Sequence, residues 1–460
     1  QGWRSKDYPT PQAVLDEIPE DDPETANTIR SGQTIGCFQI ESPGMRATLR
    51  EIQASTPQDL IAALALYRPG PLKGGLKDTF VRRYLGKEPV THLHSDLSPI
   101  LDETFGIILF QEQVLRIANE IAGFSLAEAD LLRRAMSHFD PGKQMLTLKN
   151  RFIDNAWKIR QIDPQTAIRI WELMAAFAGY GFPKAHAASY AQIAWRAAWC
   201  KTHYPAEFMG AVLANWGGYY SQRVYLSEAR RMGLVVKPPH INHSEREFKV
   251  AYPQGERILY MGLDQVRDLT RRTQRLIIAK RPFHTLDEFL LRADPSPQEA
   301  INLIKAGSLE GLGRVPAMLQ YVTNLQWSSR QPGLFDHFVD GGVERSLPEI
   351  ISDQESILGL SVDAHPLAQY SKIIKDSGVL STSDAAQHIG QSVIVAGIKQ
   401  AYRRHFTKNG AIMAFLSLED GDGMINVIIF PDLYQNIKDI LTNHSAYLVE
   451  GSVEPDASTG

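Results

Sequence analysis

Glycines and cations, two kinds of residue that suit a phosphate ligand, occur together in the run FAGYGFPKAHAASYA, residues 177–191. Gly179 and Gly181 precede Lys184 and His186, which stand at the start of an alanine-rich helical pattern. Glycine takes backbone angles that other residues avoid and lets a ligand approach closely. The first turn of a helix favours negative charge. The run therefore predicts an anion site, although a loop that only caps a helix fits it equally well.

Two adjacent arginines, Arg133 and Arg134, lie on an amphipathic helical pattern upstream of that run. Ser125 followed by Glu128 has the spacing of a capping box and marks the start of the helix. The predicted apolar stripe of this helix is Leu126, Ala129, Leu132, Ala135 and Met136. Because a planar guanidinium fits phosphate oxygens, the pair predicts contact with a triphosphate or a nucleic-acid backbone. A solvated helix face is the alternative interpretation.

Two glutamines, Gln111 and Gln113, follow a buried strand-like run and begin a helical pattern within residues 105–118. Amide side chains at such a junction can hydrogen-bond a base or a ribose. They are also ordinary residues for the start of a helix, and the spacing alone favours that reading.

A third basic region, residues 262–283, precedes glycine-containing turns. Exposed arginines and backbone N–H groups at helix starts are typical of non-specific contact with duplex DNA. The candidates are Arg271, Arg272, Gly311 and Gly313. A plain helical subdomain is the alternative.

The short peptide QPGLF stands in a polar, glycine-rich stretch at residues 326–345. Two hydrophobic side chains, Leu334 and Phe335, can fill a pocket on a partner while Gln331 hydrogen-bonds at its rim. We interpret this peptide as a protein-binding anchor.

No group of residues in the sequence predicts a metal site. The aspartates and histidines with loose ligand spacing read as turn or loop residues: Asp420 and Asp422, His92, His94 and Asp96, and His240 and His243. Two cysteines exclude a disulfide framework and favour a reducing, cytoplasmic setting.

The elements that must position these residues change in kind along the 460-residue chain. Residues 34–204 have mostly helical patterns, and residues 216–317 predict short helices and turns. Residues 380–460 predict short strands with a hairpin turn at Asn409-Gly410 and one helix, which is typical of an oligonucleotide-binding (OB) barrel. No apolar run is long enough for a membrane span. The start at Gln1 leads us to expect a piece of a longer protein.

Six ordered segments give the chain a resemblance to the bacterial C-family DNA polymerases, the α subunits of DNA polymerase III. They are GCFQIESPGMR (36–46), ALYRPGPLKGG (65–75), ETFGIILFQEQV (103–114), ADLLRRAM (129–136), the run at 177–191 and KTHYPAEFM (201–209). The resemblance implies a mainly α-helical multidomain protein with a C-terminal β-barrel. The implied domains are the end of the palm (1–35), fingers (36–215), a tandem helix-hairpin-helix domain (216–325), a linker with a clamp-binding peptide (326–379) and an OB-fold (380–460).

The resemblance also implies roles for residues. Arg133 and Arg134 match an arginine pair that faces the phosphates of the incoming nucleotide, and Lys184 and His186 match the neighbouring loop. Arg68 lies in the matching RPGP turn, where DNA contact is expected. Gln331, Leu334 and Phe335 match a sliding-clamp peptide. Expected partners are primer-template DNA, deoxynucleoside triphosphates, the clamp and other replication or repair subunits.

The chain departs from the family pattern in two places. The palm aspartates that hold Mg²⁺ in the family precede the first matching segment, so we expect no catalytic residue in this chain and no primer extension by it alone. The first hairpin has Val266-Arg267-Asp268 where a Gly-x-Gly is expected. A non-catalytic DNA- and clamp-binding module is the alternative function.

Overall fold

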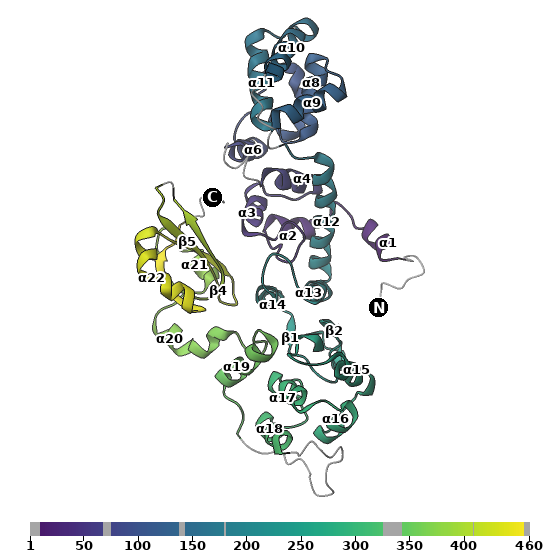
Figure 1. Ribbon diagram of the computed structural model, residues 1–460, viewed down its shortest axis with the longest axis vertical. Helices are drawn as coiled ribbons and strands as arrows, with labels where there is room; N and C mark the ends of the chain where they lie inside the picture. The colour runs from purple at the N-terminus through teal and green to yellow at the C-terminus, as the bar shows by residue number, and fades with distance from the viewer. Residues whose placement is uncertain are drawn as a thin grey trace. The chain divides into compact units, whose positions relative to one another are not determined.

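The computed structural model describes residues 10–67, 75–137, 143–178, 181–324, 343–407 and 409–454. The chain forms two compact units, which divide between His203 and Tyr204 (Figure 1). Each unit is considered by itself below. None of the helices in these ranges is long and apolar enough to cross a membrane.

The first unit is built of helices. They are α1 (Pro11–Asp16), α2 (Pro23–Arg30), α3 (Pro43–Glu51), α4 (Pro57–Leu66), α6 (Leu76–Tyr84), α7 (Ser98–Leu101), α8 (Gln111–Ala122), α9 (Leu126–Ser137), α10 (Lys143–Arg160), α11 (Pro164–Ala178) and α12 (Lys184–His203). The first four start in the same way. Thr10, Asp22, Ser42 and Thr56 each accept a backbone N–H with the side chain, and a proline follows at the first helical position. Proline costs little there because its missing N–H has no partner in the helix.

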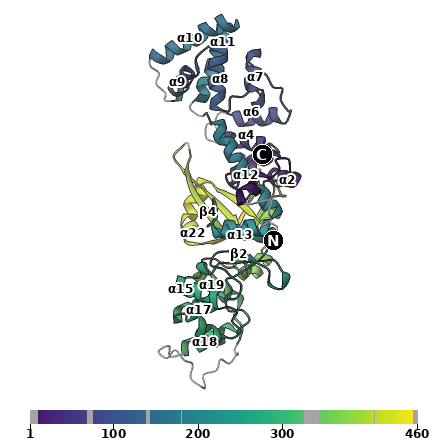
Figure 2. The ribbon, with the colours of Figure 1, turned by 90° about the vertical axis from the view of Figure 1, so that its right-hand side faces the viewer.

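Helices α8 to α11 pack around one hydrophobic core and stand together in both views (Figure 1 and Figure 2). Ile117, Phe152 and Met174 are among its fully buried members. A second hydrophobic core contains Phe80, Phe110 and Ala187, the last of which belongs to α12. Helix α12 also packs along α4. The start of α12 is therefore held against residues that immediately precede α8.

The second unit begins with two helices, α13 (Pro205–Ala214) and α14 (Gln222–Arg231). A three-stranded sheet follows, with β1 (Val235–Lys237) parallel and β2 (Lys249–Ala251) antiparallel to the central β3 (Ile258–Tyr260). The sequence predicted only helices and turns here. Strands of three residues are too short for an alternating pattern to stand out.

The hairpin helices are shorter than the apolar patterns that predicted them. The pattern at 262–283 divides into the 3-10 turn η5 (Leu263–Gln265) and α15 (Arg271–Lys280), because Thr270 caps a new helix. Next come α16 (Leu286–Ala293), α17 (Pro297–Ala306) and α18 (Val315–Asn324). Helix α17 ends at Gly307, whose φ of 87° is a left-handed conformation that favours glycine.

Helices also occupy much of the stretch suggested as a linker. They are α19 (Leu347–Leu358), the 3-10 helix η6 (Pro366–Tyr370) and α20 (Ser371–Asp376). Helix α19 packs on α17, and the buried Gln354 donates a hydrogen bond to the carbonyl of Ala306 at 3.3 Å. A short helix, α21 (Thr382–Ala385), precedes the last sheet.

The last sheet is antiparallel and curled, with the order β6-β5-β4-β7. Its strands are β4 (Ser392–Phe406), β5 (Ile412–Glu419), β6 (Met424–Ile429) and β7 (Ala446–Ser452). Helix α22 (Pro431–Asn443) covers one face with Tyr434 and Leu441. The predicted hairpin turn at Asn409-Gly410 is confirmed, with Gly410 at a φ of 77°. The predicted fold class, mainly helical with an OB-type sheet at the end, is confirmed.

Candidate nucleotide and nucleic-acid site

The start of helix α8 is joined to the glycine-rich run through the backbone. The N–H of Gln111 donates to the carbonyl of Phe182 at 2.9 Å, and its side-chain amide donates to the carbonyl of Gly181 at 2.8 Å. A Cβ atom at Gly181 would lie 2.7 Å from Cγ of Gln111. Glycine is therefore required at this position for close packing as well as for turn geometry.

Gln113 serves the fold rather than a ligand in this structure. Its side-chain oxygen accepts the backbone N–H groups of Leu109 and Phe110 at 2.8 and 2.9 Å. Its amide nitrogen donates to the carbonyl of Ile100 at 3.2 Å and to Oγ1 of Thr104 at 2.7 Å. The residue is 1% exposed, so it has no polar group left to face a base or a ribose. This arrangement matches the helix-start alternative.

Carboxylates of the protein surround the first residue of α12. The backbone N–H of Lys184 lies 3.0 Å from both carboxylate oxygens of Glu112. The ammonium of Lys184 lies 2.5 Å from Oε2 of Glu103 and 5.7 Å from the ring centre of Phe110. Both charged side chains are about two-fifths exposed. The start of α12, where the sequence predicts an anion site, is thus contacted by the chain's own acidic groups.

His186 is exposed and takes part in a row of rings along α12. Its ring centre lies 5.4 Å from that of Phe182 and 4.0 Å from that of Tyr190. Tyr190 in turn contacts Phe38 edge to face at 5.1 Å. Residues four apart share a helix face, so His186 and Tyr190 present one aromatic surface.

Both arginines of α9 are bound by one aspartate. Nε and Nη2 of Arg133 lie 3.1 and 2.9 Å from Oδ1 of Asp130, and Nη2 of Arg134 lies 2.7 Å from its Oδ2. The hydrogen bond from Arg133, followed by that from Arg134, lowers the pKa of Asp130. The Arg133 side chain is 19% exposed and that of Arg134 is 65% exposed. Asp130 therefore fixes the orientation of one guanidinium and leaves the other reachable from solvent.

The predicted capping box at the start of α9 is confirmed. Glu128 accepts from the N–H and hydroxyl of Ser125 at 2.9 and 2.8 Å, and the N–H of Glu128 donates back to that hydroxyl at 3.3 Å. Arg151 of α10 also binds Glu128 at 2.8 Å, and this bond is the main cause that lowers the pKa of Glu128 to about 2. The prediction of Leu126 in the apolar stripe is wrong: its side chain is exposed, while Ala129 and Leu132 are buried. A residue in the first turn can face outward even when it fits the helical period.

Three of the candidates in the hairpin region, Arg271, Arg272 and Gly311, are exposed and Gly313 is half-buried, and the four are not gathered into one contact. Arg271 is the first residue of α15, and Arg272 donates to the carbonyl of Asp294 at 3.0 Å and also pairs with its carboxylate. Gly311 and Gly313 have φ values of 87° and 153°. Arg68 and the peptide QPGLF lie outside the described residues.

One surface escaped the sequence prediction, the face of the last sheet opposite α22. Arg403 of β4 is paired with Phe415 of β5, which is paired with Ile428 of β6. Paired residues of antiparallel strands point to the same side, and all three side chains are exposed. Their alternation with buried neighbours was a signal for this face. An arginine beside an exposed ring is typical of surfaces that stack nucleic-acid bases.

Three family models match the chain in sequence order. Residues 5–160 match the finger domain of the bacterial DNA polymerase III alpha subunit. Residues 233–317 match a helix-hairpin-helix motif, and residues 393–460 match an OB-fold nucleic acid binding domain. The fold and these matches together define a multidomain protein of the nucleic-acid polymerase class.

Relatives cover nearly the whole chain. The DNA polymerase III subunit alpha of Thermus aquaticus is 34% identical over 95% of this chain and 38% of its own length, and that of Aquifex aeolicus is 31% identical over 96% and 38%. An error-prone DNA polymerase of Symbiobacterium thermophilum is 33% identical over 91% and 44%. The chain belongs to the bacterial DNA polymerase III alpha-subunit family. It spans about two fifths of the length of these curated relatives.

Proposed function

We propose that this chain is the part of a DNA-directed DNA polymerase that holds the incoming deoxynucleoside triphosphate and grips the primer-template DNA. The observation that carries the proposal is the arginine pair of α9, which Asp130 orients and the capping box anchors. A finger-domain match covers this helix.

Arg134 makes the first phosphate contact because more of its side chain is exposed. Arg133 adds a second positive charge from a position that Asp130 already fixes. A guanidinium binds two oxygens at once, and such charge-assisted bonds are about twice as strong as neutral ones. A preset orientation lowers the entropy that is lost when the ligand binds.

Lys184 and His186 supply the second half of the nucleotide site in this proposal. The ammonium of Lys184 exchanges Glu103 for a phosphate oxygen, since a salt bridge this exposed is worth little by itself. The surface of His186 and Tyr190 stacks against the base or the sugar. Gln111 stays in its bond to Gly181 and holds this segment in place.

In this proposal, the second unit binds the DNA. The amides around Gly311 and Gly313, together with Arg271, bind duplex phosphates, as the helix-hairpin-helix match supports. The sheet face with Arg403 and Phe415 binds the single-stranded template. Clamp binding through Gln331, Leu334 and Phe335 rests on sequence alone.

The Mg²⁺ ions that the family uses do not fit the residues at hand. Within the described ranges, no group of three or more His, Cys, Asp or Glu side chains is arranged to hold a metal ion. No step of the mechanism is therefore assigned to a metal here. The roles proposed for Arg133, Arg134 and Lys184 are limited to binding and orienting the triphosphate.

The nucleotide assignment is tested by photo-crosslinking a radiolabelled azido-dATP to the 460-residue chain, with mapping of the labelled peptide. Arg133→Ala with Arg134→Ala should abolish triphosphate-dependent labelling and leave binding of duplex DNA unchanged. Arg169→Ala, an exposed arginine of α11, is the matched control. Labelling that persists in the double variant refutes the assignment and favours a binding module without a nucleotide site.

A further inference from the structure

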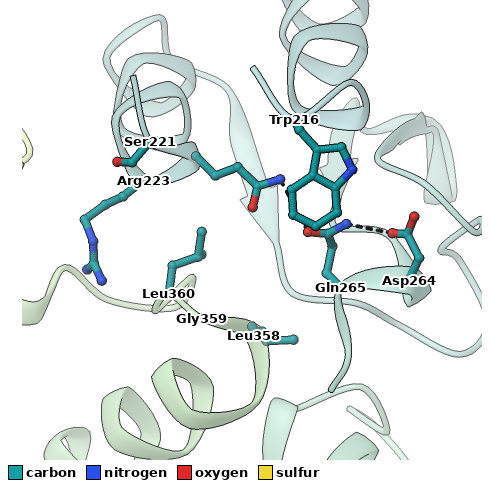
Figure 3. Close-up of a pocket in the computed structure, with 9 residues that line it drawn as sticks. Trp216, Ser221, Arg223, Asp264, Gln265, Leu358, Gly359 and Leu360 are labelled. Carbon is teal, nitrogen blue, oxygen red and sulfur yellow. Dashed lines mark hydrogen bonds between the residues drawn. The ribbon is translucent and has the colours of Figure 1, made fainter. Parts of the chain in front are cut away.

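A cavity of about 370 Å³ lies in the second unit, and none of its lining residues has been assigned a role so far. Its walls come from the loop after α13, the start of α14, the turn η5 and the end of α19 (Figure 3). This volume is in the range of small-molecule sites. The chemistry of the lining indicates what it binds.

An exposed tryptophan forms one wall. Trp216 follows α13 with a φ of 64°, an unusual left-handed conformation for a bulky residue, and its side chain is 67% exposed. The next residue, Gly217, has no room for a side chain, because a Cβ atom would lie 2.2 Å from the ring of the buried Tyr225. The backbone is thus held in a shape that presents an indole ring to solvent.

The polar side chains of Asp264 and Gln265, which together offer hydrogen-bond donors and acceptors, lie below that ring (Figure 3). The amide of Gln265 donates to Oδ1 of Asp264 at 2.8 Å and its oxygen accepts from Gln222 at 3.4 Å. Burial raises the pKa of Asp264. Adjacent amide and carboxyl groups can match the alternating donors and acceptors on the edge of a planar heterocycle.

Arg223 adds an unsatisfied donor to the opposite wall. Its Nη2 binds Glu355 at 2.8 Å, but its Nη1 is buried and has no hydrogen-bond partner within the described part of the chain. Arg223 lines the cavity, and its guanidinium therefore keeps one N–H group without an acceptor among the described residues.

We propose that this cavity binds a nucleobase, which stacks on Trp216, hydrogen-bonds through its edge to Asp264 and Gln265, and offers an oxygen to Arg223. The shared chemistry is that of a base carried either by single-stranded DNA or by a free nucleotide.

The setting of the cavity favours the single strand. The hydroxyl of Ser221, at the rim of the cavity, donates to Oε1 of Gln400 in β4 at 2.9 Å. Nη2 of Arg403 donates to the hydroxyl of Tyr219 at 3.4 Å. Arg403 belongs to the sheet face to which the proposed function assigns the template, and this part of the inference rests on that assignment. A strand on the sheet passes close enough to place one base in the cavity.

The test measures binding of a fluorescent single-stranded oligonucleotide of about 16 nucleotides to the 460-residue chain by anisotropy. The same strand with abasic sites keeps every phosphate and removes the stacking partner. Trp216→Ala should weaken binding of the normal strand about tenfold, as expected for the loss of one base–aromatic stack, and leave the abasic strand unaffected. Trp157→Ala, at another exposed tryptophan, which lies in α10, should change neither.

Two further measurements distinguish a base on a free nucleotide from a base on a single strand, and distinguish failure of the pocket from failure of the proposed sheet function. Binding of a deoxynucleoside monophosphate that is lost in Trp216→Ala, while that variant binds the strand as the wild type does, supports the base pocket and overturns its supply by the template. Equal binding by the wild type and Trp216→Ala for both ligands overturns the pocket, even if Arg403→Ala with Phe415→Ala still weakens the strand. No strand binding by the wild type contradicts the proposed function of the sheet instead.

Discussion

Replacing Gln113 with alanine tests whether this residue serves the fold or the nucleotide. The change leaves two buried N–H groups, of Leu109 and Phe110, without their acceptor, and removes the donor to Ile100 and Thr104. Each unsatisfied buried group costs about 1–3 kcal/mol. Water that enters the vacated space can relieve part of this cost. We therefore expect the free energy of local opening at the start of α8 to fall by about 4 kcal/mol, which is a roughly thousandfold change in the opening equilibrium.

Peptide-resolved hydrogen exchange is the suitable assay, because a chain of two units need not unfold in one step. Amides of α8 should exchange much faster in Gln113→Ala, while peptides of the second unit keep their wild-type rates. Gln165→Ala, an exposed glutamine of α11, should shift exchange by less than about 0.5 kcal/mol. Unchanged protection of α8, combined with weaker nucleotide crosslinking, would refute the structural role and restore the base-reading interpretation.

Three other changes have defined outcomes. Gly181→Ala should displace Gln111 and lower the melting temperature of the first unit, measured by circular dichroism, because its Cβ would lie 2.7 Å from Cγ of that side chain. Glu128 should titrate in carboxyl-selective NMR with a pKa of about 2, and Arg151→Ala should raise that pKa. Because the pKa of Glu128 is lower in the folded than in the unfolded chain, the stability that the capping box contributes is complete above the ordinary glutamate range and is lost as pH falls toward 2. His240 should titrate with a pKa of about 4, chiefly because burial disfavours its charged form, so its contribution to stability is complete above the ordinary histidine range and declines as pH falls from there toward 4.

The parts of the fold that depend on local signals were predictable. The capping box at Ser125 and Glu128 and the turn at Asn409-Gly410 each involve a few adjacent residues whose side chains or φ angles decide the conformation. The histidine pair His240 and His243, which the sequence predicts to be loop residues, packs ring against ring with centres 4.6 Å apart. Nδ1 of His240 also accepts the N–H of Asn242 at 3.0 Å.

The parts that depend on distant partners were not predictable. Nothing near Lys184 in the sequence indicates that Glu103 and Glu112 neutralise it, because these carboxylates lie 81 and 72 residues away along the chain. The cavity that Arg223 lines likewise arises only when α14 meets the end of α19. Spacing identifies residue types that can bind an anion, but the state of the site depends on tertiary contacts.

The first hairpin, which has Val266-Arg267-Asp268 where a Gly-x-Gly is expected, still forms a turn in the structure. Asp268 takes a φ of 59°, so the backbone still adopts a left-handed turn, at some cost in strain for a residue that has a side chain. The N–H of Arg267, however, donates to the carbonyl of Ile357 at 3.0 Å. That amide is already satisfied within the protein, whereas the amides of Gly311 and Gly313 have no acceptor among the described residues. The first hairpin therefore uses its Arg267 amide to join α19 to the domain, and we expect the backbone contact with a DNA phosphate at the second hairpin.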